Sequence, residues 1–140
     1  MTLEIENPRN FNLDAFIETF LIPKIQDSFI KEINNKRLVK IEEFINKLGI
    51  NIYHQYISVR NILIAAINNL SYIKLPNNNY MLQIDSNQML PNISAKLIDL
   101  AYMINYGTLS TPAYPIFTNV FSFFANRLQL LYSEYLRGVN

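Results

Sequence analysis

The chain has 140 residues, half of them hydrophobic, with 12 Lys and Arg against 11 Asp and Glu. This composition excludes an intrinsically disordered chain and a strong field of either sign that would attract nucleic acid or an anionic membrane. Because cysteine is absent, disulfides, thiolate metal sites and cysteine nucleophiles are excluded as well. We expect a single domain spanning residues 1–140.

The N-terminal part of the chain predicts an extended arm followed by a helix. Residues 1–11 favour the arm because Pro8 opposes any helix through this segment. Asn12 is a suitable N-cap for a helix that begins at Leu13. Pro23 either ends this helix or occupies the first turn of the next one.

Helical periodicity continues through the middle of the chain. Apolar residues recur at three- and four-residue steps over residues 24–48, and Gly49 is suited to end this helix. A third helix is expected over residues 52–70. Its centre, residues 62–67, is apolar on every side, which is typical of the most buried helix in a bundle.

One β-hairpin is expected to interrupt the helices, at about residues 72–84. Its loop, Pro76–Asn79, is rich in turn-forming residues. An isolated hairpin is marginally stable, so we expect it to pack on a helix or on a partner, with Tyr72 and Tyr80 as candidate partner contacts. A fourth helix follows and is expected to end at Gly107.

The chain is organised around a last long helix, expected over residues 115–137. Pro115 suits the start of a helix and Gly138 its end. One stripe is apolar and should face the core: Phe117, Phe121, Phe124, Leu128 and Leu131. The opposite face carries no charge: Asn119, Ser122, Asn126, Gln129 and Ser133. Buried charges are costly, so an uncharged helix face predicts contact with another protein, and we expect these five residues to form that interface.

No motif for catalysis, for a cofactor or for a metal ion stands out. His54 is the only histidine, and no carboxylate or second histidine lies at a spacing that would give it a partner. With three glycines, the chain lacks the common glycine-rich phosphate loops. We therefore expect no enzyme, no cofactor and no bound metal, although an enzyme with an unfamiliar site stays open as a third hypothesis.

A basic cluster supports the alternative function. Lys36, Arg37 and Lys40 would contact phosphates if they shared a helix face, as in a small helical regulatory or nucleic-acid-binding protein. Glu32, however, precedes Lys36 by four residues and favours an ordinary intrahelical ion pair. We therefore do not expect nucleic acid as a partner, and these three residues are candidate contacts only under the alternative function.

The predicted fold is all-α, a bundle of four to five helices with one inserted β-hairpin. By elimination, the predicted function is that of a non-enzymatic structural subunit in a larger assembly, with other copies of the chain as the expected partners. Only Arg127, Glu134 and Arg137 are charged beyond Tyr102, which favours an enclosed C-terminal third.

Residue usage suggests a setting for such an assembly. Ile, Asn, Lys, Tyr and Phe are abundant, as AT-rich codons favour, and small helical bundles with a projecting hairpin occur in ring-shaped connectors of tailed phages. A virion protein of the tail, neck or connector is therefore the specific hypothesis, located in the virion or the host cytoplasm. We expect neither a secretion signal nor a membrane span.

Overall fold

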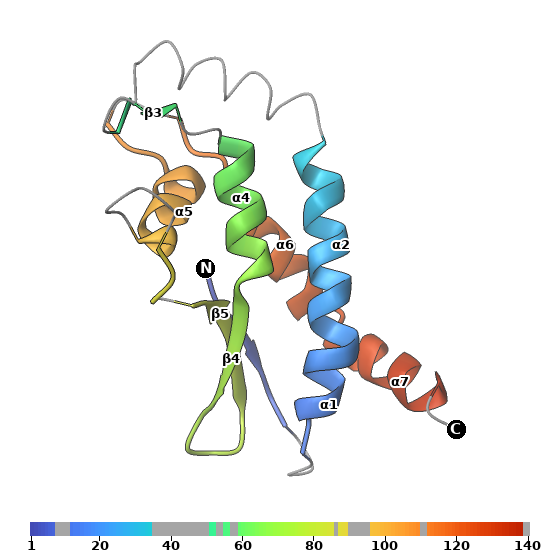
Figure 1. Ribbon diagram of the computed structural model, residues 1–140. Helices are drawn as coiled ribbons and strands as arrows, with labels where there is room; N and C mark the ends of the chain where they lie inside the picture. The colour runs from blue at the N-terminus through green and yellow to red at the C-terminus, as the bar shows by residue number, and fades with distance from the viewer. Residues whose placement is uncertain are drawn as a thin grey trace.

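The computed structural model describes residues 1–7, 12–34, 51–52, 55–56, 59–85, 87–89, 96–109 and 112–138. Figure 1 shows the arrangement of the elements. In chain order these are β1 (Leu3–Ile5), α1 (Asp14–Phe16), the π-helical turn η1 (Ile17–Leu21), α2 (Ile22–Ile33), β2 (Asn51–Ile52), β3 (Gln55–Tyr56), α4 (Val59–Asn68), β4 (Leu70–Lys74), β5 (Tyr80–Ile84), α5 (Leu97–Tyr106), α6 (Ile116–Ala125) and α7 (Leu128–Gly138).

A three-stranded antiparallel sheet in the order β1-β5-β4 corrects the all-α prediction. The hairpin β4-β5 forms where it was expected, and β1 adds a third strand to the free side of β5, with Leu3 opposite Leu82 and Ile5 opposite Tyr80. Leu3 and Ile5 are only 2% and 3% exposed. Burial of this alternating apolar face offsets the conformational entropy that is lost when the arm becomes ordered. With this sheet beside the helices, the fold is α+β.

The inner face of the hairpin is packed against the helices, as expected. Leu82 and Ile84 lie in the same hydrophobic core as residues of α2, α4 and α6. The hairpin turns through Asn78, whose φ of 65° is tolerated well by asparagine. The Leu75 amide donates to the Asn79 carbonyl oxygen at 2.7 Å and closes the loop.

The first helical segment runs without interruption from α1 through η1 into α2. At its start the Asp14 amide donates to Asn12 Oδ1 at 3.0 Å. The Ile22 amide donates to the Ile17 carbonyl, a five-residue step that widens the turn just before Pro23. A proline ring clashes with the carbonyl of the preceding turn in a regular α-helix, and a wider turn relieves that clash. Pro23 therefore lies in the first turn of α2 without breaking the segment.

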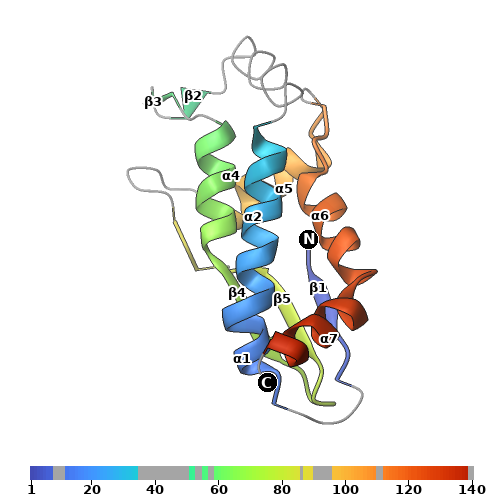
Figure 2. The same cartoon turned by 90° about the vertical axis from the view of Figure 1, so that its right-hand side faces the viewer.

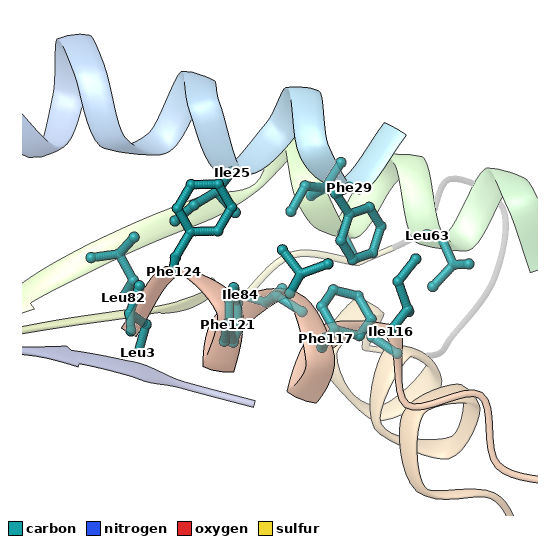
Figure 3. Close-up of a cluster of buried hydrophobic side chains, with 14 of the residues drawn as sticks. Leu3, Ile25, Phe29, Leu63, Leu82, Ile84, Ile116, Phe117, Phe121 and Phe124 are labelled. Atoms are coloured by element: carbon teal, nitrogen blue, oxygen red, sulfur yellow. The ribbon is translucent and has the colours of Figure 1, made fainter. Parts of the chain in front are cut away.

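The helices form a layer on one side of the sheet. α2 contacts both α4 and α6, and α5 contacts α4. Figure 3 shows side chains from α2, α4, α6 and the sheet meeting in one cluster. At its centre, the rings of Phe29 on α2 and Phe117 on α6 lie 4.7 Å apart. Across the α2–α4 contact, Gln26 Nε2 donates to the Ile67 carbonyl at 3.1 Å.

The predicted third helix is shorter than residues 52–70. Among the described residues, β2 pairs with β3, with Asn51 opposite Tyr56, and α4 begins only at Val59. The helix stops at Asn68 because the next residues enter the sheet, where Leu70 pairs with Ile84. Pairing with the next strand, β5, therefore overrides the local helical pattern.

The predicted single helix over residues 115–137 is also corrected. α6 ends at Ala125, a turn follows at Asn126 and Arg127, and α7 starts at Leu128. Figure 2 shows that the two helices run in different directions. The turn lets α7 fold back toward α1, where aromatic side chains of both segments meet. The packing of these rings outweighs the intrinsic preference for one continuous helix, and it therefore sets the direction of α7.

Candidate interaction surface

The five residues predicted to contact another protein are all exposed. Asn119 and Ser122 lie on α6, Asn126 lies in the turn after it, and Gln129 and Ser133 lie on α7. We call these five residues the uncharged face. Because of the turn at Asn126 and Arg127, this face extends over two helices that run in different directions and does not follow one straight helix.

Asn105, at the end of α5, fixes which side of α6 faces the core. Asn105 Oδ1 accepts hydrogen bonds from the amides of Phe117 at 3.0 Å and Thr118 at 3.1 Å. Its Nδ2 donates to Thr118 Oγ1 at 2.8 Å. These amides lie in the first turn of α6, where no intrahelical acceptor exists, so Asn105 acts as a helix cap from another element. With Phe117 held inward, Asn119 and Ser122 are left facing outward.

α7 is held against the first helical segment by aromatic contacts. The ring of Phe16 lies 5.5 Å from that of Tyr132 and 5.4 Å from that of Tyr135, and Phe20 lies 5.6 Å from Tyr135. Edge-on and tilted rings at such distances attract one another beyond the effect of burial alone. The outer side of α7, with Gln129 and Ser133, stays exposed.

Two large apolar side chains accompany the uncharged face. Phe123 is 46% exposed and Leu130 is 54% exposed. The Arg127 guanidinium lies 3.6 Å from the centre of the Phe123 ring, and its Nη1 donates to the Phe123 carbonyl at 3.1 Å. Aromatic residues and arginine are enriched in protein interfaces, and uncharged amides and hydroxyls can form hydrogen bonds across them.

A pocket of about 340 Å³ opens between the end of β1, α1 and α7. Leu13, Phe16 and Leu128 give it an apolar wall, while Glu6, Gln129 and Ser133 are among the polar residues that line it. We call it the β1–α7 pocket. Two residues of the uncharged face, Gln129 and Ser133, therefore line a concave part of the surface. In protein interfaces, pockets of this kind often accept an anchor side chain of the partner.

The end of α5 carries a second exposed apolar group. Tyr102, Met103 and Tyr106 are about half exposed, and Leu109 is fully exposed. The rings of Tyr102 and Tyr106 lie 4.4 Å apart. Gly107, with φ of 77°, ends α5 as the sequence predicted, and its amide donates to the Met103 carbonyl at 2.8 Å.

The two hairpin tyrosines proposed as partner contacts differ in their surroundings. Tyr72 is half-buried and its hydroxyl donates to Glu18 on η1. This hydrogen bond is the main cause that raises the pKa of Tyr72 above its ordinary value. Tyr80 is only 1% exposed, so its side chain lies in the core and offers no surface to a partner.

The alternative site falls in another part of the chain. Lys36, Arg37 and Lys40 lie outside the described residues, as does His54. Among the residues that the structure describes, no three His, Asp or Glu side chains come together as a metal site would require. Within the same residues, no helix has both the length and the apolar character needed to cross a bilayer.

Comparison of the chain with protein-family models, curated proteins and solved structures finds no match.

Proposed function

We propose that this chain is a structural subunit of a protein assembly, with other copies of itself as the first partners. The observation that supports the proposal is the uncharged face of α6 and α7, which lies exposed beside Phe123 and Leu130. Removing water from a charge costs several kcal/mol, whereas amides and hydroxyls can exchange water for partner groups at modest cost. A surface of this composition is therefore suited to burial in a contact.

The three-stranded sheet removes one of the two grounds for a virion setting. The virion hypothesis combined residue usage typical of AT-rich genomes with an analogy to helical bundles of phage connectors. That analogy no longer applies, because the fold contains a three-stranded sheet. Residue usage typical of AT-rich genomes is shared by virion proteins and by other structural subunits, so we propose a structural assembly of either kind.

The proposal is tested by placing two positive charges on the uncharged face. In Ser122→Lys/Asn126→Lys both side chains are exposed, so the monomer should lose no more than about 0.5 kcal/mol of unfolding free energy. Association should fall sharply, because each contact would bury like charges. Sedimentation velocity measures association, and thermal unfolding followed by circular dichroism measures the fold.

A matched control is available on α4. Asn61→Lys/Asn68→Lys adds the same charge at two exposed positions away from the uncharged face. This control should associate as the wild type does. A wild-type chain that stays monomeric at high concentration would contradict self-association, and equal effects of the two double variants would show that charge alone, not the α6–α7 face, controls association.

A further inference from the structure

We propose that this chain forms a two-fold symmetric dimer in which α7 packs antiparallel against α7 of a second copy, with Leu130 near the axis. The inference rests on the proposed function, because it names the contact through which two copies join. It combines two features of the outer side of α7: an exposed apolar residue near its middle, and one charge of each sign on either side of that residue.

The outer side of α7 is formed by two adjacent lines of exposed residues. Leu131 is buried, and Tyr132 and Tyr135 are half-buried beside Phe16, so these three residues mark the inner side. Steps of three, four and three residues keep each outer line on one side of the helix, as in the contact line between two packed helices. The exposed residues of the charged line are Arg127, Leu130, Glu134 and Arg137, and those of the uncharged line are Asn126, Gln129, Ser133 and Leu136.

Leu130 is the apolar residue near the middle of the charged line. Its side chain is 54% exposed in the single chain. At a two-fold axis the same residue of both copies meets, so Leu130 of one copy covers Leu130 of the other. Both side chains then leave water, and the contact gains free energy from each of them.

The charges on either side of Leu130 favour a second copy in the antiparallel direction. Arg127 lies three residues before Leu130, and Glu134 lies four residues after it. When two copies meet antiparallel at Leu130, Arg127 of each therefore comes level with Glu134 of the other, to within one residue. A parallel contact would place Arg127 against Arg127 and Glu134 against Glu134. Opposite charges set the direction and register of an interface, and like charges oppose it.

Both charges are available for this contact. Within the described part of the chain the Glu134 carboxylate forms neither an ion pair nor a hydrogen bond, and Arg137 Nε donates to the Ser133 carbonyl at 3.4 Å. The Arg127 guanidinium is held at the surface by the Phe123 ring, 3.6 Å from its centre, and Nη1 donates to the Phe123 carbonyl. A guanidinium has five N–H donors, so others are left to bind a carboxylate.

The uncharged line can form hydrogen bonds in the same arrangement. Gln129 of one copy comes level with Ser133 of the other, to within two residues, and an amide and a hydroxyl can each donate and accept. Because each copy uses the same surface, the contact is closed and a third copy cannot join it. The building block of the assembly is therefore a dimer.

Reversing either charge tests the contact. In Arg127→Glu and in Glu134→Arg, both meetings across the axis bring like charges together, so dimerisation of the full chain should weaken at least about tenfold. The double variant Arg127→Glu/Glu134→Arg exchanges the two charges and should restore dimerisation. Sedimentation velocity measures dimerisation, and thermal unfolding followed by circular dichroism checks the fold of each variant.

Two matched controls reverse charges elsewhere. Lys31→Glu and Asp27→Arg change the charge of the chain by the same amounts at exposed positions of α2. Both should dimerise as the wild type does. Weakening by these controls as large as that by Arg127→Glu and Glu134→Arg would overturn the assignment of the contact to α7.

A single cysteine tests the antiparallel direction. The chain has no cysteine, so Leu130→Cys places one thiol of each copy near the axis, where the two can form a disulfide. Leu136→Cys, at another exposed leucine of α7, is the matched control: in the antiparallel dimer its two copies lie about 18 Å apart along the helices, too far for a disulfide. Mild oxidation should therefore link Leu130→Cys and leave Leu136→Cys unlinked, and equal linking of both would overturn the antiparallel contact.

Mixing the two single charge variants gives the decisive measurement. In a mixture of Arg127→Glu and Glu134→Arg, every glutamate of the contact on one chain faces an arginine on the other, so a 1:1 heterodimer should form, as native mass spectrometry can show. If the wild type associates but the single charge variants associate as strongly, or if their mixture stays monomeric, this inference is overturned and the proposed function is not. A monomeric wild type overturns both.

Discussion

Asn105 at the end of α5 accepts a hydrogen bond from the amide of Phe117 in the first turn of α6, at 3.0 Å, while the Asn105 side chain is completely buried. The same oxygen accepts from Thr118 at 3.1 Å. One buried amide therefore satisfies two backbone donors that the helix itself cannot satisfy, and it connects two elements separated by a loop.

We predict that Asn105→Ala lowers the unfolding free energy by about 2–3 kcal/mol, because it leaves the buried amide of Phe117 and the part-buried amide of Thr118 without an acceptor. Urea unfolding followed by circular dichroism measures the change. Thr118→Ser serves as the control: it keeps the hydroxyl that accepts from Asn105 Nδ2 and removes only a methyl group of an exposed residue. The loss should stay within about 0.5 kcal/mol. Equal losses in the two variants would contradict the capping role.

Leu3→Ala tests whether the N-terminal arm is part of the sheet. Leu3 is buried opposite Leu82, so the variant should lose about 2–4 kcal/mol of unfolding free energy, as for other large-to-small changes in a core. If the arm were not attached to the sheet, Leu3→Ala would leave the unfolding free energy unchanged. Glu4→Ala, at the exposed position between the two buried residues, should change the free energy by no more than about 0.5 kcal/mol.

Local patterns in the sequence predicted the elements whose signals are local. The hairpin loop, the end of α5 at Gly107 and the inward stripe of α6 depend on turn residues and on periodicity within one segment. β1 has only three residues and pairs with a strand more than seventy positions away. No periodicity can be read from so short a segment, and its pairing partner is invisible to a local pattern.

The division between α6 and α7 was missed for a different reason. Apolar residues continue at three- and four-residue steps through Phe124, Leu128 and Leu131, on both sides of the turn. Periodicity therefore indicates one helix, and only the contacts of Tyr132 and Tyr135 with Phe16 explain the change of direction.

The same distinction holds for the candidate surface. The exposed positions of Ser122 and Ser133 follow from the helical pattern, because they lie opposite the apolar stripe. The β1–α7 pocket could not be predicted, because it requires three segments that meet only in the fold. Tyr80 was assigned to a partner contact although it faces the core, because alternation along a strand does not state which face is covered.

Tyr80→Phe should stabilise the protein. The Tyr80 hydroxyl is buried and has no hydrogen-bond partner within the described part of the chain. An unsatisfied buried hydroxyl costs about 1–3 kcal/mol, so removing it while keeping the ring should raise the unfolding free energy by about 1 kcal/mol. Chemical denaturation of both proteins provides the comparison. A loss of stability in Tyr80→Phe would show that the hydroxyl does form a hydrogen bond in solution.

Tyr72 gives a pH-dependent prediction. Its hydrogen bond to Glu18 raises its pKa above the ordinary value of 10.0, so the folded state favours the neutral phenol. The contribution to stability is complete below pH 10, and it is lost as the pH rises from there toward the raised pKa, because the unfolded chain then releases the proton while the folded chain keeps it. Tyr72→Phe lacks this contribution at every pH.

The variant should therefore be less stable than the wild type by about 1 kcal/mol near neutral pH, the usual value of one hydrogen bond. The difference should shrink as the pH rises above 10. Urea unfolding of both proteins at a series of pH values measures it, and the remaining tyrosines titrate equally in the two chains. Glu18→Gln supplies the control, since it keeps an acceptor but removes the charge; its stability should depend on pH less steeply than that of the wild type above pH 10. A difference between wild type and Tyr72→Phe that stays constant across this range would mean that the Tyr72–Glu18 contact does not form in solution.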